Sequence, residues 1–511
     1  MNSNPRNINA SEISGDSFGF EFDNSFSEQS EKFYSKVKPT PVKAPELFSF
    51  NTLLAKQIGI GLSDLDPNVK AQIFSGNILP YRSEPLSMVY AGHQFGGYVP
   101  QLGDGRAILI GETVGEDGQR WDVQLKGAGR TPYSRNGDGR SALGPVIREY
   151  ILSEAMHALG VKTTRALAAV TTGQNVVRES KRPGGIFTRV ALSHIRVGAF
   201  EYFSNKRDIK SVKTLADYAI NRLYPECLGS DDPYISFYKS VLNAQAELVA
   251  KWMSLGFIHG VMNTDNMSIS GETIDYGPCA FMDVYNPRKV FSSIDHQGRY
   301  AYSNQGQIAQ WNLARFGEAL LPLIHKSRTE AISIVEESLS EFSHLFEHKW
   351  LELMLLKIGI QVKKENDQKL IEQLLNLMHK DTVDFTLCFR NLSKVIGSNI
   401  DELSDTHHFF NLFESSGEIS DWVKKLNARL VQEGGSYENI IERMNLVNPK
   451  YIPRNHLVEQ AIQDAENKGD YTIFNELLDV LNSPFDERVE YEDYSKAPLP
   501  RQLVKQTFCG T

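Results

Sequence analysis

At 511 residues the chain is too long for one hydrophobic core, and its length predicts two or three domains. Acidic residues outnumber basic ones, 63 to 54, and the net charge of −9 argues against bulk binding to nucleic acid or anionic membranes. No apolar run approaches the length of a membrane span, and the first residues resemble neither a signal peptide nor a transit peptide.

The cysteines are few and scattered. Cys227, Cys279, Cys388 and Cys509 show no CxxC pairing and no metal-ligand spacing, as is typical of a reducing compartment. We therefore expect a cytoplasmic protein with no membrane or nucleic-acid partner.

We predict that residues 1–89 form an N-terminal extension ahead of the nucleotide-binding part. Residues 1–30 are rich in Ser and Asn, and we expect them to be mobile at the start. Two segments further on, Phe48–Ile60 and Pro67–Ser75, predict short helices.

The first chemical region runs from Tyr90 to Gly129. It is rich in glycine, and Ala107–Ile110 and Trp121–Lys126 predict two strands joined by a turn at Asp117-Gly118. A glycine-rich turn and a strand that ends in lysine are the means by which a kinase N-lobe holds phosphates. An ordinary hairpin with a solvated lysine has the same pattern, so the alternative stays open here.

A second glycine-rich loop, Gly137–Arg140, leads into a predicted helix between Pro145 and Gly160. Glu149 lies on an apolar stripe of this helix and needs a partner there. Lys126 is one candidate, as in the ion pair between strand and helix of kinases. Arg148 or water is the alternative.

The apolar segment Phe187–Gly198 contains Arg189 and Arg196. Guanidinium groups in such surroundings are good phosphate ligands because they stay charged and donate in a fork. Structural salt bridges fit the same spacing.

A long predicted helix from Asp232 to Leu255 delivers the loop His259–Gly277. In this loop Asp265-Asn266 is followed by two predicted short strands of a hairpin, Met267–Ile269 and Thr273–Ile274, and then by Asp275. Oxygen ligands of this kind suit Mg²⁺ bound together with substrate phosphates. The C-terminal part contains further predicted helices, among them Trp311–Ile324, Arg328–Leu345, Phe346–Leu356 and Asp470–Leu481.

The order of these features is that of a protein kinase: glycine loop, strand lysine, helix glutamate, His-led loop with Asn, then Asp-Tyr-Gly. We therefore predict an α+β, kinase-like, two-lobed fold. The N-lobe would span residues 90–185, the C-lobe residues 186–345, and a helical C-terminal domain residues 346–511.

Long motifs also make the chain similar to the selenoprotein O family. They are FEFDNSF, GHQFGGYVPQLGDGRA, QLKGAGRTPYSRNGDGR, FTRV, HGVMNTDNMSISGETIDYGP, DHQGRY and NPKYIPRNH, and they cover nearly the whole chain. The resemblance implies a kinase-like protein adenylyltransferase that binds ATP in a flipped orientation and transfers AMP.

The resemblance also implies roles for particular residues. Asp265 would be the general base, and Asn266 and Asp275 would bind Mg²⁺ or Mn²⁺. Glu149 would pair with Lys126. The implied nucleotide ligands are Gly103, Gly105, Arg106, Lys126, Asp138, Gly139, Arg189, Arg196 and Asp275.

The sequence departs from kinases and from some relatives at informative positions. Val261 stands where kinases have the catalytic-loop aspartate, and valine cannot accept a proton. Either the chain is inactive or Asp265 takes over this role. Some relatives have a redox-active cysteine pair near the tail, but Phe291 occupies the position of the partner of Cys509.

Three functional classes follow. The first is a nucleotidyltransferase that moves AMP to Ser, Thr or Tyr hydroxyls of proteins, with uridylyl transfer as a second reaction to consider. The second is a conventional phosphotransferase, which Val261 disfavours. The third is a nucleotide-binding pseudokinase scaffold. We expect protein substrates as partners and a monomeric chain.

Overall fold

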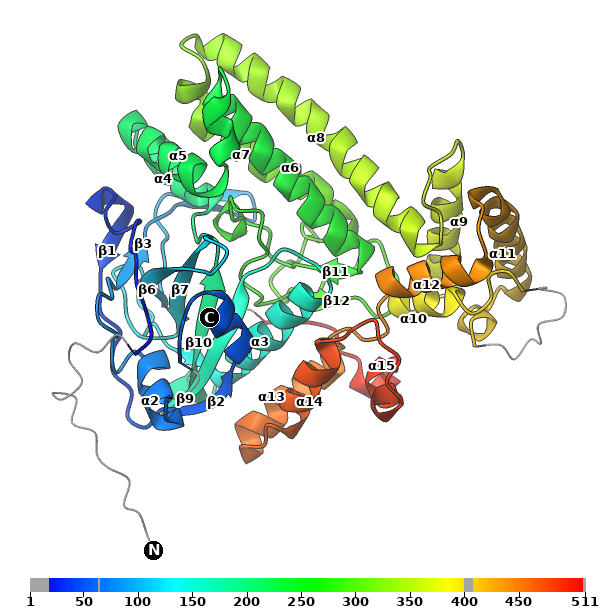
Figure 1. The fold of residues 1–511 in the computed structure, drawn as a ribbon, viewed down its shortest axis with the longest axis horizontal. Helices are drawn as coiled ribbons and strands as arrows, with labels where there is room; N and C mark the ends of the chain where they lie inside the picture. The colour runs from blue at the N-terminus through cyan, green and yellow to red at the C-terminus, as the bar shows by residue number, and fades with distance from the viewer. Residues whose placement is uncertain (1–17, 63–64, 399–407, 509–511) are drawn as a thin grey trace, which may run out of the picture.

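The computed structural model describes residues 18–62, 65–398 and 408–508. It contains an antiparallel sheet on one side and helices on the other, with further helices from the C-terminal part beside both (Figure 1). The chain is therefore of mixed α and β structure, as predicted. In the described residues, no helix is both long and apolar enough to cross a membrane.

The main sheet has the strand order β1-β3-β6-β7-β10-β9-β2, with β8 paired to β10. Three strands from the predicted N-terminal extension, β1, β2 and β3, lie in this sheet, so this part of the extension belongs to the sheet and does not simply precede it. The strands are β1 Tyr34–Lys36, β2 Glu46–Phe50, β3 Leu86–Met88, β6 Ala107–Val114, β7 Arg120–Lys126, β8 Ser141–Ala142, β9 Arg165–Val177 and β10 Lys181–Ala191.

The centre of the sheet places the predicted lysine and arginine on neighbouring strands. The hairpin of β6 and β7 turns at Gly118, whose φ of +78° suits glycine. In β10, Phe187 lies opposite Lys126 and Arg189 lies opposite Gln124. Helix α3, Leu143–Ala158, packs against β9 and β10 and ends before Gly160, which has a φ of +74°.

Helices form the second layer. The predicted long helix is α6, which begins with Pro233 at its first turn and ends before Gly256 in the left-handed region. It packs against α7 and α8. The helices of this layer are α4 Val197–Asn205, α5 Ile209–Leu223, α6 Pro233–Ser254, α7 Gln305–Ile324 and α8 Arg328–Lys357.

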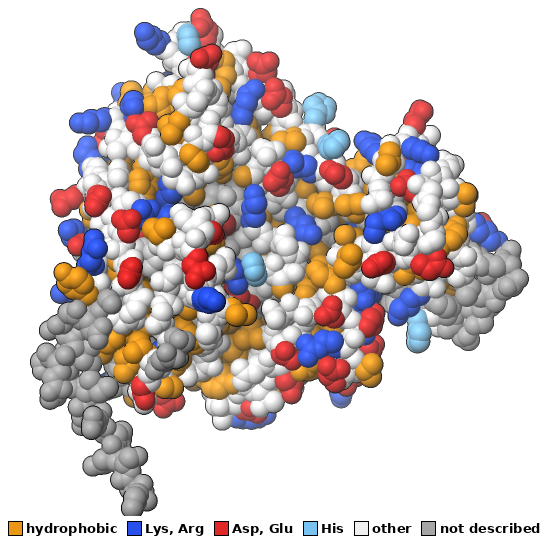
Figure 2. Space-filling model, viewed as in Figure 1, with side chains coloured by type: hydrophobic (Ala, Val, Ile, Leu, Met, Phe, Trp, Pro, Cys, Tyr) orange, Lys and Arg blue, Asp and Glu red, His pale blue; other side chains and the backbone are white. Residues whose placement is uncertain are grey.

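The C-terminal helices contact both layers. Helices α13 and α14 pack on α3 of the sheet layer, and α9 and α12 contact α8. These helices are α9 Asp367–Lys380, α10 Phe385–Leu392, α11 Ser416–Leu430, α12 Tyr437–Val447, α13 Asn455–Lys468, α14 Thr472–Leu481 and α15 Glu492–Ser495. On the face shown in Figure 2, acidic and basic side chains are interspersed over the surface.

Several local predictions need correction. Residues 46–50 form strand β2, because they pair with β9, and the helix that follows is only α1, Thr52–Gln57; α2, Pro67–Phe74, agrees with the prediction. The predicted helices on either side of residue 345 are one helix, α8. The expected domain limits at 185/186 and 345/346 therefore fall inside β10 and α8. Residues 18–30, which we expected to be mobile, bury aromatic side chains such as Phe20 and Phe22.

The predicted hairpin at residues 267–274 is wrong. Met267–Ile269 pairs with the segment around Arg196, through Val197 N to Met267 O at 2.9 Å and Ile269 N to Ile195 O at 3.1 Å. Thr273 instead pairs with Thr163. Both segments have strand-like sequences, but each finds its hydrogen-bond partner in a different part of the chain.

Candidate active site

A cleft of about 840 Å³ lies between the sheet and the loop that follows α6. All of the residues predicted for the site line it, although they come from elements far apart in the sequence. These residues are Gly103, Gly105, Arg106, Lys126, Asp138, Gly139, Glu149, Arg189, Arg196, Asp265, Asn266 and Asp275.

Lys126 at the end of β7 meets Glu149 of α3 inside the cleft. Their Nζ and Oε2 atoms are 2.6 Å apart, and the second oxygen of Glu149 accepts from Nη1 of Arg189 at 3.3 Å. The predicted ion pair is therefore present, and Arg148 forms its own pair with Glu459. A buried carboxylate with two cations is stabilised by charge-assisted bonds that offset its desolvation.

Asp275 forms ion pairs with three cationic side chains of the cleft. Its Oδ1 accepts from Lys126 and Arg189 and its Oδ2 from Arg196, each at 2.7 Å. Burial raises the pKa of this carboxyl, but Lys126, Arg196 and Arg189 outweigh burial and hold the pKa well below its ordinary value. Its φ of +65° is rare outside glycine and is imposed by these contacts.

The loop before Asp275 is fixed by His259. Its Nε2 lies 2.9 Å from the carbonyl oxygen of Ile274, its ring stacks on Trp252, and burial lowers its pKa. Val261 faces the cleft, and its carbonyl accepts from Nδ2 of Asn266 at 3.1 Å. No proton-accepting side chain therefore stands at the kinase position.

Asp265 is the nearby carboxylate with proton-acceptor capacity. Its Oδ1 is buried without a hydrogen-bond partner, while Oδ2 accepts from Nε2 of Gln94 at 3.0 Å. Burial raises its pKa to about 6, against the opposing effects of Gln94 and Arg196. A carboxyl that titrates near neutrality is well matched to general-base work.

Both glycine-rich loops line the cleft and pack against the segment between them, residues 129–134. A Cβ at Gly103 would lie 2.5 Å from the ring of Tyr133, and one at Gly139 would lie 2.0 Å from the carbonyl oxygen of Gly129. Both glycines have positive φ, so both backbone conformation and space exclude other residues. Asp138 forms a bidentate pair with Arg178, which lowers its pKa.

Oxygen donors for a hard cation come together in this cleft. They are the carboxylates of Asp265 and Asp275 and the side-chain amide of Asn266. Across the described part of the chain, no cluster of three or more His, Cys, Asp and Glu side chains could hold a metal alone. A divalent cation here would need further oxygens from a substrate, as Mg²⁺ sites in phosphoryl enzymes do.

The sequence prediction missed other residues of the site. Gln94 contacts Asp265, Tyr90 lies under the guanidinium of Arg196 at 4.8 Å, and buried Asp104 is 3.6 Å from Arg196. Gln94 and Asp104 stand inside the glycine-rich motifs, so their position could have marked them. Their contacts depend on the fold and could not have been predicted from the sequence.

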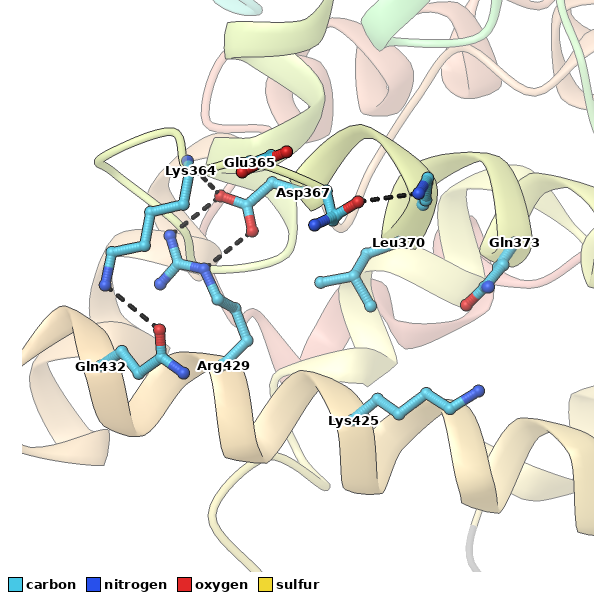
Figure 3. A pocket seen from close by; sticks show the side chains of 10 residues that line it. Lys364, Glu365, Asp367, Leu370, Gln373, Lys425, Arg429 and Gln432 are labelled. Atoms are coloured by element: carbon cyan, nitrogen blue, oxygen red, sulfur yellow. Dashed lines mark hydrogen bonds and ion pairs between the residues drawn. The ribbon is translucent and has the colours of Figure 1, made fainter.

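A second pocket, of about 410 Å³, lies between α9 and α11 and shares no residue with the cleft. Figure 3 shows Asp367 and Arg429 facing each other across it, with bonds of 2.8 and 2.9 Å. Its buried charges are thus already paired. The described cysteines, Cys227, Cys279 and Cys388, are buried, and the predicted tail thiol Cys509 lies outside the described residues.

Comparisons with known proteins find similarity over nearly the whole chain. The model of a family described as Protein adenylyltransferase SelO matches residues 17–482. Proteins named Protein nucleotidyltransferase YdiU are similar over nearly their full lengths. That of Maridesulfovibrio salexigens is 52% identical over 490 residues, covering 96% of this chain and 98% of the relative. That of Rhizobium etli is 50% identical over 492 residues, covering 96% and 97%.

The family model and these relatives define an enzyme of the nucleotidyltransferase class. The chain belongs to the SelO family of protein adenylyltransferases. ATP is accordingly its substrate.

Proposed function

We propose that the enzyme transfers AMP from ATP to the hydroxyl group of a Ser, Thr or Tyr side chain of a protein and releases pyrophosphate. The observation that carries this proposal is the arrangement of the cleft. Val261 stands where kinases have their base, and Asp265, with its pKa raised to about 6, lies in the same cleft. Three cations paired to Asp275 also lie there. Relatives named for protein nucleotidyl transfer support it.

The proposal includes a kinase-like fold of two lobes. The sheet with α3 would be the N-lobe and helices α4–α8 the C-lobe, with ATP in the cleft between them. Because β10 ends at Ala191 and α8 ends at Lys357, we place the limits of the C-lobe at about residues 192 and 357. This division keeps every helix and strand whole.

The cations of the cleft would bind the phosphates of ATP. Lys126, Arg189 and Arg196 now share one carboxylate, and a triphosphate offers them more negative charge than Asp275 alone. Gly103 and Gly105 with Arg106, and Asp138 with Gly139, would hold the nucleotide from the two glycine-rich loops, where backbone can approach a ligand closely.

Asn266 and Asp275 would hold Mg²⁺ or Mn²⁺, since they offer hard oxygen donors in the same cleft. When bound, such a cation neutralises phosphate charge and orients the phosphates. Arg189 and Arg196 would stabilise the charge that develops on the leaving pyrophosphate.

In the reaction the acceptor hydroxyl gives its proton to Asp265. Its oxygen forms a bond to the α-phosphorus, and the bond from this phosphorus to the oxygen that bridges to the β-phosphorus breaks. AMP remains on the protein and pyrophosphate leaves. Which phosphorus reacts depends on which one faces the acceptor, since this chemistry is mostly positioning and charge neutralisation.

The acceptor is a protein, and we propose that the enzyme acts as a monomer. We also propose a cytoplasmic setting, which the small number and scattered positions of the cysteines support.

The test uses ATP labelled at the α- or the γ-phosphate, with the mass of the modified protein measured afterwards. We expect label from the α-position alone, lost in Asp275→Ala and strongly reduced in Asp265→Ala. Label from the γ-position alone would mean a kinase, and ATP binding without either label would mean a scaffold.

A further inference from the structure

A small hairpin outside the main sheet packs directly against the loop that contains Asp265. It consists of β4, Gly92–Gln94, and β5, Gly97–Val99, and belongs to no other sheet among the described residues. The backbone N–H of His93 donates to Thr264 Oγ1 at 2.7 Å, and that of Phe95 donates to Asn263 Oδ1 at 3.1 Å. The hairpin is thus hydrogen-bonded to both residues that precede Asp265.

The same hairpin contacts both oxygens of Asp265. Gln94 Nε2 donates to Oδ2 at 3.0 Å. On the other side, a Cβ at Gly92 would lie 2.4 Å from Oδ1, so only glycine leaves room for the carboxylate. Because an amide holds Oδ2 and Gly92 packs closely on the side of Oδ1, the carboxylate has one defined orientation.

The base of the hairpin is fixed to the start of α4, just after Arg196. Ala91 N donates to Gly198 O at 2.9 Å, and a Cβ at Gly198 would lie 2.1 Å from the carbonyl oxygen of Ala91. Nη1 of Arg196 donates to the backbone carbonyl of Asp265 at 2.6 Å. The hairpin, Arg196 and Asp265 therefore form one connected unit.

We propose that Gln94 is a positioning residue of the reaction: its amide holds Oδ2 of Asp265 and so fixes the orientation of this carboxylate in the cleft. This inference rests on the proposed function of Asp265. A hydrogen bond to one carboxylate oxygen restricts rotation about the terminal side-chain bond, and small misplacements of a reacting group are costly.

The experiment compares Gln94→Met with Gln101→Met, which makes the same change at an exposed glutamine outside the cleft. Gln94→Met keeps the length of the side chain and removes the donor. We expect kcat for α-label transfer to fall about 10- to 100-fold, with the Kd for ATP, the KM for the acceptor protein and the melting temperature unchanged. Gln101→Met should match the wild type.

Gln94→Asn keeps an amide on a shorter stem, and its kcat should lie between those of the wild type and Gln94→Met. An unchanged kcat in Gln94→Met, or a kcat loss matched by equal losses in ATP affinity and melting temperature, would overturn the role of Gln94. If the wild type transfers the γ-phosphate, the proposed AMP transfer fails, but a selective kcat loss in Gln94→Met still supports positioning. Wild type that binds ATP and transfers nothing overturns both.

Discussion

Asp275 balances the charge of the cleft, because one carboxylate accepts from Lys126, Arg189 and Arg196. Sequence spacing left the arginines open between phosphate ligands and salt bridges. The structure shows ion pairs in the absence of nucleotide, and the two uses are compatible, since a triphosphate can compete for the same cations.

At Lys126 the prediction separates catalysis from folding. Lys126→Met should lower kcat/KM by about 100-fold or more, the typical loss when a group that stabilises transition-state charge is removed. Stability should change less, because Arg189 still pairs with both Glu149 and Asp275. Exposed Lys162→Met is the control. Proportional losses of activity and melting temperature would assign Lys126 a structural role instead.

Lys357 predicts a pH dependence of stability. It is buried against the rings of Phe385 and Phe389, and burial lowers its pKa from 10.5 to about 7, with Lys251 acting in the same direction. The unfolded chain therefore binds more protons between pH 7 and 10.5, and the contribution of Lys357 to stability rises with pH across this window.

Lys357→Met should accordingly be more stable than the wild type at pH 6, with a difference that shrinks as the pH approaches 10. Urea unfolding at several pH values measures this, with exposed Lys326→Met as control. Parallel pH profiles for wild type and Lys357→Met would show that Lys357 is not held neutral.

Among the elements, those with strong local signals were predictable. The β6–β7 hairpin, α3 and α6 have clear turns, caps and periodicity. The segments at 267–274 also have strand-like sequences, yet they pair with residues near 196 and 163, because each partner is chosen by tertiary packing and not by local sequence.

The site was predictable as far as its motifs reached. The strand and the helix stripe made Lys126 one candidate partner of Glu149, and the resemblance to a family, carried by long motifs, implied this pair and the remaining residues. Gln94 and Asp104 stand inside a glycine-rich motif, but a motif does not show that Gln94 contacts Asp265 or that Tyr90 and Asp104 lie beside Arg196, because those contacts arise from the fold.

The C-terminal segment holds the loop after Asp275. Thr507 donates to the carbonyl oxygen of Pro278 through its hydroxyl and to that of Phe291 through its N–H at 2.8 Å, and it accepts from Ser293 N at 3.1 Å. Each such bond contributes about 1 kcal/mol. The segment therefore fixes a loop that borders the cleft.

Two truncations test this role. Removing residues 509–511 should leave melting temperature, ATP affinity and activity unchanged. Removing residues 507–511 should lower activity by roughly fivefold or more through the loss of these bonds. Equal behaviour of the two truncated chains would show that Thr507 does not fix the loop.

In the whole molecule, two C-terminal helices pack against the sheet layer that lines the cleft. Helices α13 and α14 bury their apolar faces against α3, the helix that carries Glu149. Phe474 is fully buried there, with its ring 5.6 Å from those of Tyr150 and Phe48. Helices α13 and α14 are thus part of the core behind the cleft.

Phe474→Ala should lower the free energy of unfolding by about 3–5 kcal/mol, the usual cost of a large cavity. Because α3 positions Glu149, activity should fall at temperatures where the variant is still folded. Phe508→Ala, at an exposed ring, is the control. Chemical denaturation and activity assays measure both effects, and a stability loss without any loss of activity would show that α3 keeps its place without this packing.

AMP transfer is tested most directly by the nucleotide product. The wild-type enzyme, ATP, Mg²⁺ and an acceptor protein are incubated together, and phosphorus NMR follows the nucleotide while mass spectrometry follows the protein. Pyrophosphate should appear in equal amount to the modified acceptor, with no ADP, and Asp265→Ala should form both far more slowly. ADP formed in step with acceptor modification would contradict AMP transfer.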